Sequence, residues 1–371
     1  MQLNLTPLNE WGLGNSDQLI ISGPCSAETE EQVLATAHEL VKLNPQVKVF
    51  RAGIWKPRTR PNNFEGVGLD ALRWLKLVKK ETGLKVAVEV ANGHHVYECL
   101  KYGIDLLWIG ARTTVNPFSV QEIADALKGV DIPVLVKNPL NPELQLWLGA
   151  LERVNNAGIS KLGAIHRGFS TFKKTPYRNS PEWYMAIELK RQLPELPIIC
   201  DPSHITGKRS LIGEVSQKAL NLAMNGLMIE AHINPQEAWS DAAQQLSPEG
   251  LHQVLSKLKF RTPEGEDILK EDLLELLRED IDDLDHELLD VIARRAEIAE
   301  KIGQYKKAHN MTILQVTRWD DLLSERLGKA LALGLDETTM KEIFKQIHIQ
   351  SIKIQEKVLS KANGDKVKSN Q

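Results

Sequence analysis

The chain has 371 residues, of which 42% are apolar and 26% are charged, and its formal net charge is −3. That length suits a large domain joined to a smaller one, and the composition is typical of a folded chain rather than a disordered one. The weak negative charge argues against nucleic acid or an anionic membrane as a partner. The sequence also lacks the run of roughly 18 apolar residues that a membrane-spanning helix needs.

The N-terminal segment MQLNLTPLNEWGLGN has neither the basic start nor the apolar core of a signal peptide. The three cysteines, Cys25, Cys99 and Cys200, are odd in number and far apart in the sequence. A disulfide framework is therefore not expected, and the sequence predicts a reduced, cytoplasmic protein.

A change of composition divides the chain. All 17 prolines and all three cysteines lie before residue 264, and the remainder is rich in Leu, Ile, Glu and Lys. This change predicts a domain boundary at the polar segment RTPEGEDILK. We therefore expect a first domain over residues 1–260, a linker over 261–270 and a second domain over 271–371.

Short apolar, β-branched runs alternate with helix-like segments before the boundary. The expected strands are QLIISGPC, VKVFRAG, LKVAVEV, IDLLWIGA, IPVLVKN, KLGAIHRG, LPIICDP and NGLMIEA, and the clearest helices cover residues 30–43, 69–81, 94–102 and 119–128. Mostly apolar strands are typical of parallel strands that are covered on both faces. The pattern predicts an α/β fold with a (β/α)8 barrel. An open doubly wound sheet is the alternative, and it is disfavoured because no GxGxxG follows the first strand.

After the boundary, apolar residues recur at helical spacing. The first long helix would carry Ile281, Leu284, Leu288, Ile292, Ile298 and Ile302. Two further helices are expected over residues 318–333 and 337–360, with Gly334 at a helix stop. The pattern predicts a small all-helical domain, which often needs a partner to cover its apolar face.

Charged side chains gather just after the expected strands, which is where barrel enzymes carry out their chemistry. Six of them are the cations Arg51, Lys56, Arg58, Arg112, Lys137 and Arg167. One such cation would more often be a solvated surface charge. Six at one mouth repel one another unless anions lie between them, and Arg and Lys suit phosphate and carboxylate oxygens. The set therefore predicts a site for more than one anionic group.

A second set at the strand ends combines a thiol, an imidazole and two carboxylates, namely Cys25, His204, Glu230 and Asp241. These donors suit a divalent transition metal. Alone, Cys25 would more often be a small core residue. The sequence has no local CxxC or HExxH spacing, so the metal prediction depends on the shared position of these residues at the strand ends.

The motifs GPCS, RAGIWKPRT, GAR, VKNP, HRGF, DPSH and MIEAH, in this order, resemble those of the type I DAHP synthases, in the branch allied to the KDO8P synthases. The resemblance covers roughly residues 18–260. It implies condensation of phosphoenolpyruvate with erythrose 4-phosphate, because KPRT is similar to the form that binds this sugar. Relatives that use arabinose 5-phosphate usually carry Asn in place of Arg58.

The same resemblance implies roles for the residues at the strand ends. A divalent metal, Mn²⁺ or similar, would bind to Cys25, His204, Glu230 and Asp241. Phosphoenolpyruvate would contact Arg51, Lys56, Arg112, Lys137 and Arg167, and erythrose 4-phosphate would contact Arg58 and Thr59. Lys137 is also the candidate for a proton-shuttling role. Arg60 departs from the family pattern, because relatives often have Ser there.

In the helical domain, Arg295 lies in a predicted inward seam, where a cation needs a partner. The seam consists of Leu284, Leu288, Ile292, Ala299 and Ile302. Lys306 follows Arg295 about 20° around the same helix and about 16 Å along it, so both can reach one ligand. Ser351 and Gln355 share a face of the last helix. The alternative for Lys306 is an exposed charge on an amphipathic helix.

This pattern resembles the all-helical AroQ-type chorismate mutases over about residues 268–360. The resemblance implies that chorismate binds to Arg278, Arg295, Lys306, Arg318, Ser351 and Gln355. It further implies that Lys306 and Gln355 act in a cofactor-free rearrangement of chorismate to prephenate. Trp319 and Gln315 depart from the pattern, because relatives usually carry Glu and Asp there. That departure predicts weaker binding of the substrate hydroxyl.

Three interpretations of function are open. The first is a bifunctional enzyme, and the second is a DAHP synthase with a catalytically weak domain that senses chorismate or prephenate. The third is a condensing barrel of different sugar specificity with an interaction domain, which KPRT disfavours. Lys306 and Gln355 favour the first interpretation over the second, because a sensor would not need both contacts to the ether oxygen.

We also expect a homodimer through the helical domain and leave a higher oligomer open. Arg278 and Arg295 are 17 residues apart on one helix, which is about 25 Å. Both can bind one small diacid only if they come from different subunits. Because the first strand is expected near residue 19, the helical domain is also the expected sensor of pathway products.

Overall fold

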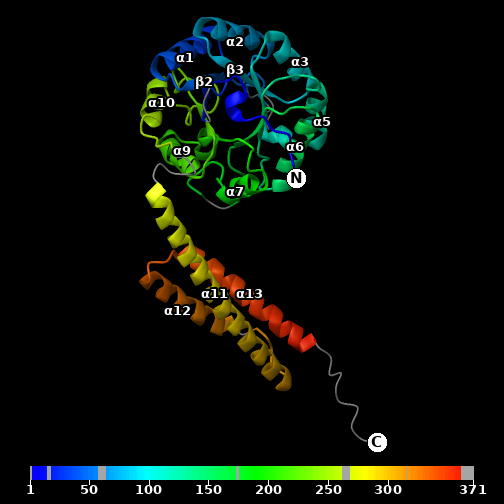
Figure 1. The fold of residues 1–371 in the computed structure, drawn as a ribbon, viewed down its shortest axis with the longest axis vertical. Helices are drawn as coiled ribbons and strands as arrows, with labels where there is room; N and C mark the ends of the chain where they lie inside the picture. The colour runs from blue at the N-terminus through cyan, green and yellow to red at the C-terminus, as the bar shows by residue number, and fades with distance from the viewer. Residues whose placement is uncertain are drawn as a thin grey trace, which may run out of the picture. The chain divides into compact units, whose positions relative to one another are not determined.

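The computed structural model describes residues 2–14, 18–56, 64–172, 175–260, 268–314 and 316–360, and the side chains of residues 268–276 and 316–318 lie outside that description. The chain divides into two compact units, Met1–Glu264 and Gly265–Gln371. The first unit is a barrel of strands surrounded by helices, and the second consists of helices that lie side by side (Figure 1).

Eight parallel strands close into a barrel in chain order. They are β1 (Leu19–Gly23), β2 (Val47–Arg51), β3 (Lys85–Val90), β4 (Leu106–Ile109), β5 (Val134–Lys137), β6 (Leu162–His166), β7 (Ile198–Cys200) and β8 (Gly226–Glu230). β1 pairs with β8, with Ile21 opposite Met228, so the sheet has no edge. This closure confirms the predicted (β/α)8 barrel and excludes the open sheet.

Helices cover the outside of the barrel (Figure 1). The helices of this unit are α1 (Glu30–Leu43), α2 (Leu69–Thr82), α3 (Gly93–Tyr102), α4 (Ala111–Thr114), α5 (Pro117–Ala126), α6 (Leu144–Asn156), α7 (Trp183–Gln192), α8 (Pro202–Thr206), α9 (Ile212–Asn221) and α10 (Pro248–Leu255), with the 3-10 turn η2 (Arg209–Leu211). A second 3-10 turn, η1 (Leu8–Glu10), belongs to the N-terminal segment, and its Leu8 packs in the barrel interior. Their limits follow local chemistry. The side chain of Thr29 caps α1 by accepting a hydrogen bond from the Gln32 amide, and Gly83 ends α2 at a φ of 74°.

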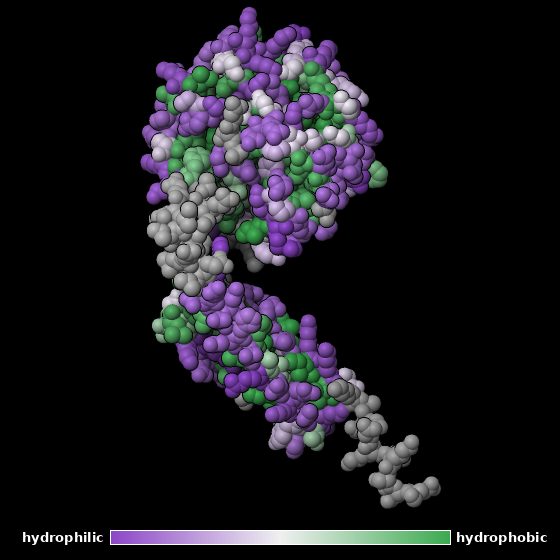
Figure 2. Space-filling model, viewed as in Figure 1, coloured by the Kyte–Doolittle hydropathy of each residue, from purple (hydrophilic) through white to green (hydrophobic). Residues whose placement is uncertain are grey.

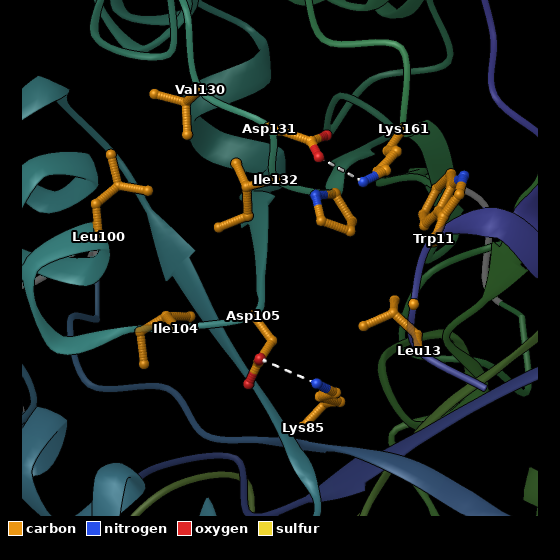
Figure 3. Close-up of a pocket in the computed structure, with 12 residues that line it drawn as sticks. Trp11, Leu13, Lys85, Leu100, Ile104, Asp105, Val130, Asp131, Ile132 and Lys161 are labelled. Carbon is orange, nitrogen blue, oxygen red and sulfur yellow. Dashed lines mark hydrogen bonds and ion pairs between the residues drawn. The ribbon is translucent and has the colours of Figure 1, made fainter.

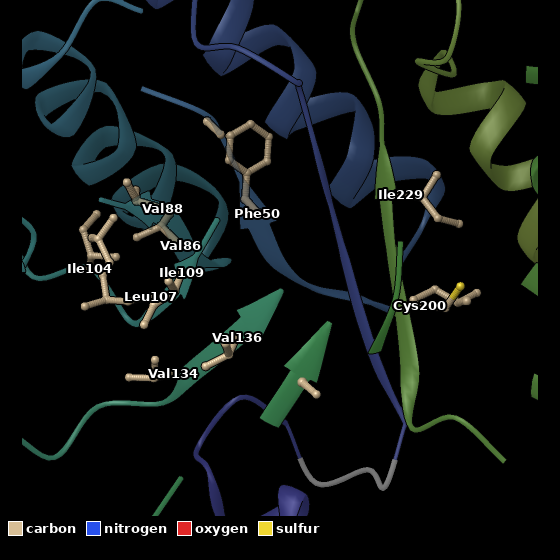
Figure 4. Close-up of a cluster of buried hydrophobic side chains, with 14 of the residues drawn as sticks. Phe50, Val86, Val88, Ile104, Leu107, Ile109, Val134, Val136, Cys200 and Ile229 are labelled. Atoms are coloured by element: carbon tan, nitrogen blue, oxygen red, sulfur yellow. The ribbon is translucent and has the colours of Figure 1, made fainter. Parts of the chain in front are cut away.

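The barrel has two apolar cores, because alternate residues of a strand face opposite sides of the sheet. One core lies between the strands and the helices and includes Val86, Val88, Leu107 and Ile109 (Figure 4). The other fills the interior, where Leu8, Trp11 and Leu13 of the N-terminal segment join strand residues such as Ile21, Val49, Leu135, Ile165 and Met228. Burying one such large side chain stabilises the fold by about 1.5–3 kcal/mol relative to leaving it exposed.

The second unit consists of α11 (Ile268–Ala308), α12 (Val316–Ala332) and α13 (Glu337–Ser360). The limits of α13 agree with the sequence prediction, α12 starts two residues before the predicted Arg318, and Gly334 has a φ of 74° at the predicted helix stop. α11 and α13 approach closely at Gly303, where an added Cβ would lie 3.2 Å from the Cα of Gln355. None of the described helices is long and apolar enough to cross a membrane.

The prediction that the apolar seam of α11 faces inward is wrong for the single chain. Ala299 is 5% exposed, but Leu284, Leu288 and Ile302 are 62%, 55% and 44% exposed. The two other helices, α12 and α13, cover only part of α11, so much of its apolar surface stays in contact with solvent. Apolar residues, in green, are visible on the surface of the helical unit in Figure 2.

Candidate active sites

Four charged residues at the strand ends face the barrel interior, because each lies two positions after an interior core residue of its strand. Val49 precedes Arg51, Leu135 precedes Lys137, Ile165 precedes Arg167 and Met228 precedes Glu230 in this way. Arg51, Lys137 and Arg167 are 2%, 4% and 8% exposed. The closed barrel therefore brings three predicted cations together at the carboxyl ends of its strands.

Arg51 lies in the centre of this cluster. Its Nη1 forms an ion pair of 3.3 Å with Oε1 of Glu230, and its Nη2 donates to the Cys25 carbonyl at 3.1 Å. Its guanidinium carbon also lies 5.0 Å from the ring centroid of Trp108. Arg51 is thus oriented by the aromatic ring and by two residues of the predicted metal set.

Asp201 joins the predicted cationic site to the predicted metal site. Its Oδ2 lies 2.9 Å from Nζ of Lys137 and 2.8 Å from Nδ1 of His204. The carboxylate is fully buried, and its pKa is held well below the ordinary value because His204 and Lys137 outweigh the opposing effect of burial. A hydrogen bond at Nδ1 leaves Nε2 of His204 available as a ligand atom.

The predicted metal ligands lie together. Cys25, Glu230 and Asp241 offer ligand atoms within 4.8 Å of one another, and Nε2 of His204 lies 3.7 Å from Oε1 of Glu230. That Glu230 oxygen is buried and, apart from its ion pair with Arg51, has no hydrogen-bond partner among the described residues. A thiol, an imidazole and two carboxylates around such an oxygen fit a divalent transition metal.

Cations contact the outer sides of this ligand set. Nζ of Lys56 lies 3.0 Å from Sγ of Cys25, and Nη1 of Arg178 lies 2.9 Å from Oδ1 of Asp241. Burial, followed by the charge of Glu230, raises the pKa of the Cys25 thiol to about 11. Burial also acts to raise the pKa of Asp241, but His204 and Arg178 outweigh it and hold that pKa below its ordinary value.

The loop that carries Lys56 depends on a glycine. An added Cβ at Gly53 would lie 2.4 Å from the Cys25 carbonyl oxygen and 2.6 Å from Nζ of Lys56. Any larger residue would push the Cys25 and Lys56 segments apart.

The remaining predicted residues of the barrel site differ in position. Arg167 donates from Nη1 to Oδ1 of Asn179 at 2.9 Å, whereas Arg112 is exposed on α4. Burial lowers the pKa of Arg167 to about 10, and the nearby cations Arg178 and Arg112 act in the same direction. Arg58 and Thr59, predicted to bind the sugar phosphate, lie outside the described residues, as does Arg60.

Sequence reasoning assigned no role to Asp201 and Arg178. Asp201 stands in DPSH two residues after Ile199, which also belongs to the interior core, so the alternation of the strand could have revealed it. Arg178 lies in the long connection between β6 and α7, and no local pattern distinguishes it.

A pocket of about 340 Å³ lies at the opposite end of the barrel, around Trp11 and Leu13 (Figure 3). Lys85, which begins β3, pairs with Asp105 at 3.6 Å, and Lys161, just before β6, pairs with Asp131 at 2.8 Å. These residues lie at the amino ends of their strands, so the pocket is remote from the predicted chemistry, which occupies the carboxyl ends.

In the helical unit, α13 meets the cations of α11. Arg295 donates from Nη1 to Oγ of Ser351 and, at 3.3 Å, to the Ile347 carbonyl. Lys306 donates to the Ile313 carbonyl. Lys306, Ser351 and Gln355 are 8%, 7% and 8% exposed, and the buried Oε1 of Gln355 has no hydrogen-bond partner in the described part of the chain. Of the predicted set, Arg295 and Ser351 are therefore in contact, and Lys306 and Gln355 are buried on the same two helices. Two members of the set differ in position.

Those two members are Arg278 and Arg318. Arg278 is exposed on α11, and the side chain of Arg318 lies outside the described residues. Gln315, one of the two departures from the mutase pattern, also lies outside them. The other departure, Trp319, stacks on His348 of α13 with ring centroids 3.9 Å apart.

Sequence reasoning did not identify Arg326 and His348. Burial lowers the pKa of Arg295, and the charge of Arg326 on α12 lowers it further. The guanidinium of Arg326 lies 5.3 Å from the ring centroid of Phe344 on α13. Neighbouring cations of this kind suit an anionic ligand, but Arg326 has no sequence signal that separates it from a surface charge.

Residues 5–264 match the model of the DAHP synthetase I family. The chain belongs to the DAHP synthetase I family. Residues 277–356 match the model of chorismate mutase type II. This DAHP synthase family member therefore joins a barrel domain and a chorismate mutase domain in one chain, which confirms the predicted bifunctional organisation.

Relatives of the barrel fall into two groups. The chain is 33% identical over 252 residues to a phospho-2-dehydro-3-deoxyheptonate aldolase of Thermotoga maritima, covering 68% of this chain and 72% of that protein. It is 27% identical over 273 residues to a 2-dehydro-3-deoxyphosphooctonate aldolase of Protochlamydia amoebophila, covering 68% of this chain and 94% of that protein. The crystal structure of the Thermotoga maritima DAHP synthase superposes with a TM-score of 0.59 at 32% identity, covering 65% of this chain and 68% of that one.

Proposed function

We propose that the barrel condenses phosphoenolpyruvate with erythrose 4-phosphate to give DAHP and phosphate, and that the helical domain rearranges chorismate to prephenate. The observation that carries the first activity is the convergence of buried Arg51, Lys137 and Arg167 beside the cluster of Cys25, Glu230 and Asp241. Buried cations beside a set of metal donors suit a substrate that carries a phosphate and a carboxylate.

Arg51, Lys56, Arg112, Lys137 and Arg167 are proposed to hold phosphoenolpyruvate. The three most buried of them lie in a low-dielectric interior, where charge interactions are stronger than in water. Fixed cations of this kind orient the reacting carbon and stabilise negative charge that develops during bond formation. Arg58 and Thr59 are proposed to hold the erythrose phosphate.

Cys25, His204, Glu230 and Asp241 are proposed to hold a divalent ion, Mn²⁺ or similar. When bound, such an ion supplies Lewis-acid polarisation of an aldehyde oxygen. Asp201 would orient the His204 ring through Nδ1, at 2.8 Å. The same carboxylate contacts Lys137 at 2.9 Å, which supports Lys137 as the residue that exchanges a proton with the aldehyde oxygen or with attacking water.

The choice of sugar is tested directly by product formation. Each aldose phosphate, erythrose 4-phosphate or arabinose 5-phosphate, is supplied with phosphoenolpyruvate and Mn(II), and phosphate release is measured. We expect turnover with erythrose 4-phosphate and little with arabinose 5-phosphate. Arg58→Ala should mainly weaken sugar-phosphate binding, since it removes a charged contact of about 1.5–3 kcal/mol. Equal efficiency with both sugars would contradict the specificity inferred from KPRT.

For the helical domain, Arg278, Arg295, Arg318 and Ser351 are proposed to bind the carboxylates and hydroxyl of chorismate. Lys306 and Gln355 are proposed to stabilise charge on its ether oxygen. The buried, unpartnered Oε1 of Gln355 supports a ligand contact at that position. The reaction is a unimolecular rearrangement, so holding the compact conformer of the substrate is the main task of these residues.

A second candidate function for this domain is ligand sensing with weak catalysis. Trp319, which replaces the usual Glu, stacks on His348 instead of presenting a carboxylate. We propose that chorismate or prephenate bound in the helical domain changes the condensation rate, as linkage between two sites permits. Both reactions should be assayed on the full chain with and without each ligand. An unchanged condensation rate at saturating ligand would contradict the sensing role.

We further propose that the protein is cytoplasmic and forms a homodimer through the helical domain. Leu284 and Leu288 are 62% and 55% exposed on α11, and this apolar surface is what a second copy would cover. Arg278 and Arg295 lie on the same continuous helix, about 25 Å apart. Arg278 would therefore complete the site of the partner subunit.

Subunit mixing tests the shared mutase site. Arg278→Ala and Arg295→Ala proteins should each be poorly active alone. A mixed dimer would have one site with both arginines and one site with neither. Exchange should therefore restore up to about half of the wild-type mutase activity per mixed dimer. No recovery after demonstrated exchange, or a fully active monomer, would exclude the shared site.

A further inference from the structure

The loop between β6 and α7 contacts both the proposed anion site and the proposed metal site of the barrel. The loop residues involved are Arg178, Asn179 and Ser180. Asn179 is 7% exposed. Its Oδ1 accepts a hydrogen bond from Nη1 of Arg167 at 2.9 Å, and its Nδ2 donates to the His204 carbonyl at 2.6 Å. One buried amide therefore joins a cation of the proposed phosphoenolpyruvate site to the backbone of a proposed metal ligand.

Backbone contacts hold this loop on both sides. On the side of α8, the amide of Asn179 donates to the Ile205 carbonyl at 3.0 Å. On the side of β6, Phe169 and Ser180 exchange two backbone hydrogen bonds of 2.7 and 2.9 Å. An added Cβ at Gly168, whose φ is 78°, would lie 2.8 Å from the Asn179 carbonyl oxygen. The backbone of Asn179 is thus held in place by its neighbours, and its side-chain amide has little freedom to move without them.

His204 is fixed at two points, because Asp201 holds its ring at 2.8 Å and Asn179 holds its carbonyl. A small displacement of α8 would therefore change the position of the Asn179 amide. The same amide orients the guanidinium of Arg167, so the displacement would also change the geometry of the anion site. A side chain that bonds to two elements at once offers a physical connection through which energetic coupling can pass.

We infer that Asn179 is a positioning residue that couples anion binding at Arg167 to metal binding at His204. The inference rests on the function proposed above for the two sites. Coupling is reciprocal at equilibrium, so the metal should tighten phosphoenolpyruvate binding by the same factor by which phosphoenolpyruvate tightens metal binding.

Binding measurements on the full chain test this without the need for turnover. The affinity for phosphoenolpyruvate is measured by titration calorimetry with and without Mn(II). The affinity for Mn(II) is measured from the electron paramagnetic resonance signal of the free ion, with and without phosphoenolpyruvate. In the wild-type protein we expect each ligand to tighten the other by about fivefold or more.

Two variants separate positioning from general support. Asn179→Asp keeps an acceptor for Arg167 but cannot donate to the His204 carbonyl. Its new carboxylate beside Arg167 should lower the affinity for phosphoenolpyruvate without metal. The coupling factor compares two affinities of the same variant, and it should fall to near one. Asn179→Ala should lose both the acceptor for Arg167 and the donor to the His204 carbonyl. Asn155→Ala is the matched control, because the Asn155 amide donates to the Asn4 and Ile159 carbonyls away from the site, and it should keep the wild-type coupling.

The outcomes are distinguishable. If phosphoenolpyruvate fails to bind to the wild-type protein, the proposed function of the anion site is wrong. If both ligands bind but do not affect each other, or if Asn179→Asp keeps the full coupling factor, the role of Asn179 is wrong and the proposed function stands. Should Asn179→Asp fail to fold by circular dichroism, Asn179→Ser answers the same question, and full coupling in that variant would overturn the inference.

Discussion

Arg51 and Glu230 form an ion pair of 3.3 Å inside the barrel, with side chains 2% and 0% exposed. Such a buried pair adds little net stability compared with well-packed apolar residues, but a single buried charge without its partner is costly. Function accounts better for the pair, because one member belongs to the proposed anion site and the other to the proposed metal site.

Loss of one partner should therefore destabilise the barrel. Glu230→Ala is expected to lower the free energy of unfolding by about 3 kcal/mol or more, since it leaves Arg51 buried without its carboxylate. Denaturant unfolding of the metal-free protein measures this change. Glu237→Ala is the matched control, because Glu237 is exposed only seven residues further on, and it should change little. Equal losses in both variants would show that Arg51 does not depend on Glu230.

Metal removal should separate the two activities. Treatment with a chelator is expected to abolish condensation and leave the mutase rate unchanged, because the donor cluster lies in the barrel unit. Addition of Mn(II) should restore condensation. Cys25→Ala should have the same effect as the chelator and should resist rescue at ordinary Mn(II) concentrations. Full condensation after rigorous chelation would rule out the metal assignment.

The affinity for the metal should depend on pH. Burial and Glu230 raise the pKa of the Cys25 thiol to about 11, so the thiol is protonated at neutral pH. Binding of an ion by the thiolate must release that proton. At pH values below the thiol pKa, the apparent affinity for the metal should therefore increase about tenfold for each unit by which the pH is raised.

Calorimetry of Mn(II) binding in buffers of different ionisation enthalpy measures the released proton. Cys25→Ala should lose this proton release while His204, Glu230 and Asp241 remain. An affinity that does not change with pH, or the same proton release in Cys25→Ala, would show that the thiolate is not a ligand.

In the helical domain, two adjacent arginines make a matched pair. Arg295 contacts Ser351 and the Ile347 carbonyl, whereas Arg294 is exposed. Arg295→Ala should lower the kcat/KM of the mutase by about a hundredfold or more, the usual scale for losing a positioned charge in a transition state. Arg294→Ala should stay near wild type. Similar losses in both variants would indicate a general electrostatic effect in place of a specific contact.

The sequence alone determined the architecture of the barrel and named most of the charged residues that lie at the carboxyl ends of its strands. Apolar strands such as those ending in Arg51, Lys137 and Glu230 are recognisable because burial on both faces demands them. Residues at the carboxyl ends of parallel strands must meet once the sheet closes. The motifs and the composition change near residue 264 likewise made the helical domain predictable.

Only the tertiary structure decided which side chains contact one another. The bridges made by Asp201 and Asn179 join segments distant in the chain, and hydrogen-bonding partners at such distances leave no periodic pattern in the sequence. The exposure of Leu284 and Leu288 could not be predicted from the sequence either. An apolar repeat has the same sequence pattern whether its own chain or a second copy covers it. Strand periodicity is a local property, whereas the pairing of loops and the covering of a helix face depend on how the whole chain packs.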